Sequence, residues 1–282
     1  MNGILCRVYN DGSHYVAHKL ENAAERLERR EKTDNGEFDK LYFGCLKNGK
    51  SSSEASDEIY AYYGGLMSRE EIAEGIERIR RNIWLRVKRF KRKAYMQLNK
   101  WNYFVTVTYD DKKQTEESFR MRLSKCLSNL HTRRGWLYMG VFERAPETGR
   151  LHFHAIMHVP TGQLVGSVEL TTEYNPLHKK KESYYKSSFF TERFGRSEMK
   201  PINGTTLKFT SALDYIVKYI NKSNESIRYS RGTPESLIKE ISEDDFAAEF
   251  MDFVVKYVLF DDVICDPTEI VNDTEDYGLP ES

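Results

Sequence analysis

The hydrophobic pattern between residues 70 and 98 predicts a long amphipathic helix. Apolar side chains recur there at intervals of three and four residues, which places them on one helical face: Ile72, Ile76, Ile79, Ile83, Val87 and Phe90. The other faces carry closely spaced cations interleaved with aromatic residues. This mixture favours contact with nucleic acid, and the residues that we predict to make it are Arg86, Lys88, Arg89, Lys91 and Arg92.

Residues 103–222 show an alternation of strand and helix patterns. Residues 103–109 are β-branched or aromatic throughout, as in a central strand, and Thr115 can cap a helix that buries Phe119, Leu123, Leu127 and Leu130. The patterns that follow predict two strands around a turn at residues 146–149, an insertion, a short strand and a last helix, at residues 136–143, 151–159, 163–200, 206–209 and 212–222 respectively.

This order of elements predicts an α+β fold, in which helices pack on an antiparallel sheet. A helical N-terminal extension precedes the sheet. The domain organisation that we expect is an accessory region, the basic helix, a central domain that includes the insertion, and an acidic C-terminal tail, at residues 1–75, 76–100, 101–234 and 235–282.

The charge of the chain is unevenly distributed. The 282 residues contain 43 basic and 43 acidic side chains, but residues 235–282 hold 15 acidic residues against only Lys239 and Lys256. This tail therefore carries a charge of about −13 and the rest of the chain about +13. A basic body suits binding to a phosphate polymer.

Composition also narrows the cellular setting. No stretch approaches the roughly 18 apolar residues of a membrane span, and the N-terminal residues lack the order of a signal peptide. The four cysteines lie far apart without a Cys-x-x-Cys pair, which argues against a disulfide framework. We expect a cytoplasmic protein with no membrane partner.

Two histidines alternate along the strand predicted at 151–159. His152 and His154 point to one side of that strand while Phe153 points to the other. Two neutral imidazoles on one face can act as paired ligands for a divalent metal. A strand with two surface histidines would show the same pattern.

The last predicted helix carries tyrosines on its polar side. Its apolar stripe is formed by Leu213, Ile216, Val217 and Ile220, and the same spacing repeats on the opposite side at Tyr215, Lys218, Tyr219 and Lys222. The two phenols are therefore not core residues. Phenols one turn apart beside two ammonium groups could accept a phosphoryl group, provided that a metal, a base or Lys218 assists an otherwise poor nucleophile.

In order along the chain, residues 104–111, the His152–His154 pair and residues 215–222 resemble the three motifs of HUH endonucleases, most of all the rolling-circle replication initiators of small single-stranded DNA phages and plasmids. The resemblance spans residues 101–225. It implies the ferredoxin-like or RRM-like nuclease fold of that family. It also implies nicking of single-stranded origin DNA, a hairpin included, through a 5′-phosphotyrosine intermediate, with a host helicase or polymerase as partner in the bacterial cytoplasm.

The resemblance also assigns roles to residues. It implies that His152 and His154 hold Mg²⁺ or Mn²⁺, that Tyr215 is the first nucleophile and Tyr219 the second, and that Lys218 steadies the phosphate. Glu143, nine residues before His152, is the favoured third ligand because oxygen suits these metals; His158 is its competitor. Lys222 joins the basic helix among the expected DNA contacts.

Other functions remain open at this level. A transposase or relaxase would share the chemistry, although two tyrosines one turn apart favour repeated rounds of replication. A noncatalytic single-strand binder with structural histidines is the alternative of another class. Residues 44–51 fit the phosphate-loop pattern G-x-x-x-x-G-K-[ST], but the buried strand that such a loop needs is not evident before them.

Overall fold

The computed structural model of the chain describes residues 4–12, 15–19, 36–145, 149–175, 179–202, 207–222, 225–241 and 256–259. These residues fold into two compact units. The first comprises the described residues within 1–96, 221–223 and 234–282, and the second those within 97–220 and 224–233.

The first unit combines a four-stranded antiparallel sheet with three helices. The sheet has the order β10-β1-β2-β11, with β1 at Ile4–Asn10, β2 at Tyr15–Lys19, β10 at Leu237–Ile241 and β11 at Lys256–Leu259. The helices are α1 (Glu37–Lys47), α2 (Ser52–Tyr63) and α3 (Arg69–Tyr95). The N-terminal extension is thus helical over residues 37–95 as predicted, but it begins with a β-hairpin that the sequence pattern did not reveal.

Serine side chains fix where α2 and α3 begin. Ser51 and Ser68 each accept a hydrogen bond from the backbone N–H three residues on, and the carboxylates of Glu54 and Glu71 accept one in return from the N–H of the cap residue. These reciprocal capping boxes satisfy otherwise unpaired N–H groups at the helix start. The apolar stripe predicted for residues 70–98 is buried along α3.

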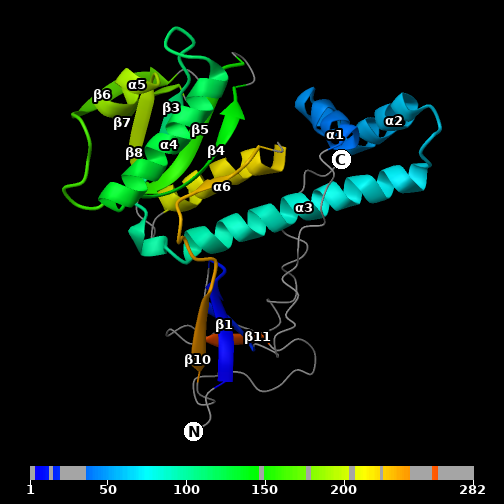
Figure 1. Cartoon of the computed structure of the whole chain (residues 1–282), viewed down its shortest axis with the longest axis horizontal. Helices are drawn as coiled ribbons and strands as arrows, with labels where there is room; N and C mark the ends of the chain where they lie inside the picture. Colours follow the sequence, from blue (N-terminus) through cyan, green and yellow to red (C-terminus); the bar gives the residue numbers. More distant parts are fainter. Residues whose placement is uncertain are drawn as a thin grey trace. The chain divides into compact units, whose positions relative to one another are not determined.

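The second unit is built on a seven-stranded antiparallel sheet with the order β6-β7-β8-β3-β5-β4-β9. Figure 1 shows α4 running across its strands. The elements in chain order are η1 (Leu98–Lys100), β3 (Tyr103–Thr108), α4 (Glu116–Arg134), β4 (Leu137–Arg144), β5 (Leu151–His158), β6 (Val168–Asn175), β7 (Lys180–Ser187), α5 (Ser188–Arg193), β8 (Ser197–Pro201), α6 (Leu207–Lys222) and β9 (Arg228–Tyr229). The α+β prediction with an antiparallel sheet is confirmed.

Residues 163–200, which the sequence marks as an insertion, are an integral part of this sheet. They supply β6, β7 and β8, and β8 pairs with the central strand β3. The strand predicted at residues 206–209 is wrong, because α6 already begins at Leu207. Leu207 is exposed and Phe209 is buried, so a short apolar pattern that we interpreted as a strand belongs to the first turn of an amphipathic helix.

Alternation along the central strands assigns each residue to one of two faces. One face packs on α4 and α5 and forms an apolar core that includes Val105, Val107, Phe142, Phe153, Phe119, Leu123 and Leu127. The other face lies toward α6, whose tyrosine rings contact side chains of β3 and β5. The sheet is thus covered by helices on both sides.

Gly140 of β4 lies where the two central strands of the hairpin approach most closely. A Cβ atom at this position would lie within 2.6 Å of the Ala155 Cβ atom and closer still to the carbonyl oxygen of His154. Glycine is required here by this close approach of β5, not by its backbone angles.

Candidate functional site: a histidine–tyrosine cluster on the α6 face

The register of three strands brings the predicted metal ligands together. Glu143 of β4 lies directly opposite His152 of β5, and Thr108 of β3 faces His152 from the other side. The next rung on the same face holds Thr106 and His154. Because directly paired residues of antiparallel strands share a face, all these side chains point toward α6.

Threonine hydroxyls hold both imidazole rings. The Nδ1 atom of His154 lies 3.0 Å from Oγ1 of Thr106, and Nδ1 of His152 lies 3.2 Å from Oγ1 of Thr108. The two rings are parallel, with centroids 5.7 Å apart. With both Nδ1 atoms engaged, the Nε2 atoms are the ones that remain for a ligand.

Glu143 completes this cluster from the neighbouring strand. Its Oε2 atom lies 3.0 Å from Nε2 of His154, and both side chains are almost completely buried. His158, the competing third ligand, instead places its Nδ1 atom 2.6 Å from the backbone carbonyl oxygen of Lys100. The structure therefore brings Glu143, and not His158, to the pair of histidines.

Both predicted tyrosines of α6 pack against His154. The ring of Tyr219 stacks on the imidazole at 5.4 Å between centroids, and the ring of Tyr215 meets it edge to face at 5.1 Å. The two phenol rings lie 5.0 Å apart, and Phe104 of β3 contacts Tyr215 as well. As its place on the polar side of α6 predicts, Tyr215 remains 41% exposed and can be reached from solvent.

Burial sets the protonation states in the cluster. It lowers the pKa of His152, with a further contribution from His154, so that this imidazole is neutral at neutral pH and able to bind a metal. Burial also raises the pKa of Tyr215 and of Tyr219, although the hydrogen bond that Tyr215 accepts from Tyr219 opposes the effect on Tyr215. Both phenols are therefore protonated at neutral pH.

The donor chemistry of Glu143 and His154 fits a divalent ion. Ligands at bond lengths of about 2.1 Å and at right angles on an octahedral ion lie about 3.0 Å apart, which is the distance between the Glu143 oxygen and the His154 nitrogen. In the described part of the chain, however, no three His, Cys, Asp or Glu side chains are arranged so that they could together hold a metal ion. The pair is preformed, and a three-ligand site is not.

The remaining predicted residues lie at different distances from this cluster. Lys218 and Lys222 are exposed on α6. On α3, Arg86 is buried at 8% exposure, Arg92 stacks on the ring of Tyr9 at 3.8 Å, and Lys88 lies 4.2 Å from the Trp84 ring. Arg89 pairs with Glu235 at 3.0 Å, and Lys91 is half-buried with an interaction of its own.

Sequence reasoning missed the residues that orient the histidines. Thr106 and Thr108 alternate on β3 at the same spacing as His152 and His154 on β5, and this matching period of two was the available signal. It also missed Lys200 of β8, whose charge lowers the pKa of Tyr215. Lys200 is paired with Glu182 at 2.8 Å.

Residues 44–51 do not have the setting of a phosphate loop. Gly44 lies within α1, Gly49 follows the helix, and Ser51 caps α2. The Lys50 ammonium pairs with Glu58 at 2.7 Å. A helix therefore stands where a phosphate loop needs a buried strand.

Comparison with known proteins identifies a similarity that covers this cluster. Among the described residues, no helix is both long and apolar enough to cross a membrane. Comparisons with curated proteins and with solved structures give no match. Residues 102–224, however, match a family model of replication-associated proteins, that of the ORF2 type, over a span that runs from β3 to the end of α6. This match supports a replication initiator family for the chain, and with it a role in DNA replication that involves nucleic acid.

Proposed function

We propose that this chain is a replication initiator that nicks and rejoins single-stranded DNA at an origin, and so starts rolling-circle replication. The observation that carries the proposal is the packing of His154 against Tyr215, Tyr219 and Glu143 in one cluster. A nucleophile, a second nucleophile and a metal-binding pair are thereby within reach of one phosphodiester.

The nicking step follows from the chemistry of Tyr215. Its phenol oxygen attacks the phosphorus atom and forms a new P–O bond, while the bond from phosphorus to the 3′ oxygen breaks. The proton of the phenol leaves to the Glu143 carboxylate or to water, and the 3′ oxygen takes up a proton to become a hydroxyl. The products are a 5′-phosphotyrosine and a free 3′ end that primes synthesis.

Tyr219 gives the same site a second nucleophile. It lies one helical turn from Tyr215, and its hydroxyl donates a hydrogen bond to that of Tyr215. After one round of synthesis, Tyr219 attacks the regenerated origin while Tyr215 still carries the first end. The freed 3′ hydroxyl then displaces Tyr215 and closes the circle.

Glu143 and His154 are the residues that would hold Mg²⁺ or Mn²⁺, with His152 as the third proposed ligand. Such an ion, when bound, would neutralise charge on the phosphate oxygens as the attack proceeds. Thr106 and Thr108 orient the two imidazoles through their Nδ1 atoms, which leaves the Nε2 atoms for binding. Lys218, exposed on the same helix as both tyrosines, is the proposed phosphate contact.

Covalent trapping tests the proposal. A labelled single-stranded oligonucleotide that carries the origin is mixed with the protein and Mn²⁺, and a denaturing gel is searched for a labelled, protein-linked fragment. Wild type should form the adduct, and the double variant Tyr215→Phe/Tyr219→Phe should form none. His152→Ala should lose most of it. Tyr174→Phe, which alters an exposed tyrosine outside the cluster, is the matched control and should react like wild type.

Two outcomes would give a different function. An adduct that persists in the double tyrosine variant would place the nucleophile elsewhere. Wild-type protein that binds the strand as tightly as the double variant, yet forms no adduct with any origin sequence, would be a noncatalytic single-strand binder. A transposase or relaxase would form the adduct but would rejoin ends other than those of its own replication origin.

A further inference from the structure

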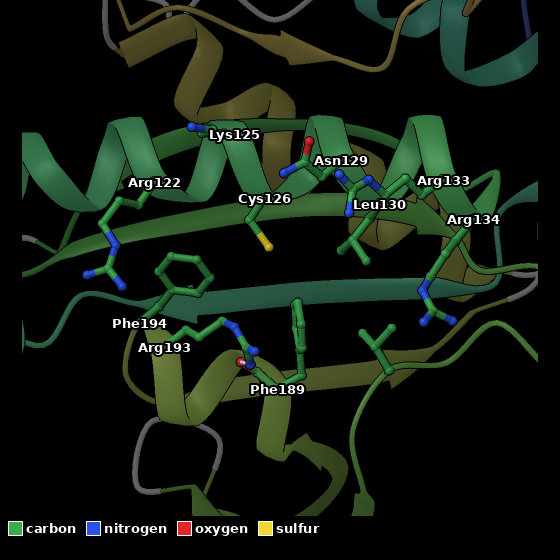
Figure 2. Close-up of a pocket in the computed structure, with 11 residues that line it drawn as sticks. Arg122, Lys125, Cys126, Asn129, Leu130, Arg133, Arg134, Phe189, Arg193 and Phe194 are labelled. Atoms are coloured by element: carbon green, nitrogen blue, oxygen red, sulfur yellow. Dashed lines mark hydrogen bonds between the residues drawn. The ribbon is translucent and has the colours of Figure 1, made fainter.

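A basic groove lies between α4 and α5, on the face of the sheet opposite to the histidine–tyrosine cluster. The groove encloses about 420 Å³. Figure 2 shows that Arg122, Cys126 and Arg134 project from α4 toward Phe189, Arg193 and Phe194. The remaining residues that line it are Lys125, Asn129, Leu130, Arg133 and Val165, and none of the lining residues is acidic.

The cations of this groove lack partners of opposite charge. Within the described ranges, none of Arg122, Lys125, Arg133, Arg134 and Arg193 forms an ion pair with a carboxylate. Arg122 donates to the amide oxygen of Gln114, and Arg193 to the backbone carbonyl of Phe189, which are both neutral acceptors. Five like charges gathered without compensation favour the binding of an anion.

The groove extends along the helix. Arg122 and Arg134 are twelve residues apart on α4, which corresponds to about 18 Å along the helix axis. Lys125, Asn129 and Arg133 fall between them at helical spacing, so polar groups follow the groove over its whole length. A single phosphate ion would use only part of this row, whereas a phosphodiester chain could use all of it.

Aromatic and apolar side chains form the base of the groove. The half-buried ring of Phe189 lies under the Arg193 guanidinium, 4.0 Å from its carbon atom, and Phe194 is buried beside it. Cys126 is half-buried, and burial raises the pKa of its thiol to about 11, so that it stays neutral. An accessible aromatic face beside cations is the arrangement that holds unpaired bases and their backbone.

We propose that the α4–α5 groove is a second binding site for single-stranded nucleic acid, separate from the site of cleavage. The arginines and Lys125 contact successive phosphates, and a base stacks in the groove against Phe189 and Arg193. An acidic peptide would satisfy the cations but would make no use of the aromatic base. The phosphodiester strand satisfies both.

Binding measurements on the full chain test this site without nuclease chemistry. Fluorescence anisotropy is recorded with labelled oligothymidylate of about 20 nucleotides, in EDTA, on a Tyr215→Phe background. Arg122→Ala/Arg134→Ala should weaken binding at least tenfold. It should also reduce the slope of log affinity against log salt by about 1.4, because two phosphate contacts are lost. Phe189→Leu should weaken binding roughly tenfold with an unchanged slope.

The matched control removes two cations elsewhere on the same unit. Lys180→Ala/Lys181→Ala changes the net charge equally at exposed positions of β7 and should retain wild-type affinity and slope. Equal losses in the control, or wild-type binding by the groove variants, would overturn the proposal. Displacement of the oligonucleotide by a peptide of residues 261–282, with Phe189→Leu having no effect, would also overturn it and assign the groove to an acidic partner.

The groove and the proposed nuclease fail in distinguishable ways. With a short oligonucleotide limited to the cleavage site, the groove variants should form the phosphotyrosine adduct at the wild-type level. Loss of the adduct in Tyr215→Phe/Tyr219→Phe leaves oligothymidylate binding unchanged.

Discussion

The two faces of the seven-stranded sheet differ in what they bury. Toward α6, neighbouring rungs present Glu143, His152, His154 and the threonines that orient the rings. Toward α4, the same strands present a continuous apolar core with cations only at its rim. Because successive residues of a strand alternate between faces, chemistry and packing are interleaved along β5 at single-residue spacing. A substitution at one residue should therefore affect stability, and at the next residue activity.

Phe153 offers the largest effect on the packing side. Its ring is fully buried, with a centroid 4.9 Å from that of Phe142. Phe153→Ala should lower the free energy of unfolding by about 3–5 kcal/mol, since it removes a large side chain from a closed core. Urea unfolding of the full chain, followed by tryptophan fluorescence, measures the change. A loss below about 1 kcal/mol would mean that the core face is less tightly packed than the comparison requires.

Thr106 offers the corresponding test on the opposite face. Thr106→Val keeps the shape but removes the hydroxyl that contacts Nδ1 of His154. We expect adduct formation to slow about 10- to 100-fold, because partners that orient metal-binding imidazoles have effects of this size. The same variant should unfold within about 1.5 kcal/mol of wild type. If the rate were unchanged, the threonines would not position the histidines.

The start of α4 should show a smaller effect. The Thr115 hydroxyl accepts a hydrogen bond from the Ser118 backbone N–H at 3.2 Å and caps the helix that carries the groove. Thr115→Ala should cost about 1 kcal/mol of stability, and Thr115→Ser should restore most of it. Equal stabilities of the alanine and serine variants would argue against a capping role.

The smallest effect concerns an ion pair that ties α4 to β4. The Arg144 guanidinium beside Glu116 holds the pKa of that carboxyl below its usual value. A depressed folded pKa stabilises the protein above the unfolded pKa of about 4.3, and this contribution is lost as the pH falls through the folded value. Both side chains are partly exposed, so the contribution is below about 1 kcal/mol.

Comparing wild type with Arg144→Ala from acid to neutral pH tests this pair. The two proteins should differ most near neutral pH and converge in acid. A difference that grows as the pH falls would have the wrong sign for this interaction.

The sequence predicted the central elements of the second unit well. Alternation in residues 103–109 and 151–159, and the helical period after Thr115, are local patterns that tertiary context did not override. The cluster of His152, His154, Tyr215 and Tyr219 was predictable for the same reason. The pairing of β1 and β2 with β10 and β11 was not, because those strands are joined across more than 200 residues of sequence.

Basic residues show where a count of charges misleads. The dense cations of α3 attracted the prediction of DNA contact, yet Arg86 is buried, and Arg89 and Arg92 already have partners within their own unit. The cations of α4 are fewer and more widely spaced, and no sequence pattern marks them as unpaired. Only the arrangement of α4 against α5 reveals that they gather around one groove.

Gly140 connects the backbone of the hairpin to the cluster. Since any side chain there would press against the carbonyl of His154 and the Ala155 methyl group, even alanine would spread β4 from β5. Glu143 sits on one of these strands and His154 on the other, so such spreading would pull the carboxylate off the imidazole without touching either residue. The tolerance that lets a metal pair form is thus set by the absence of a single methyl group, three residues before Glu143 on the same strand.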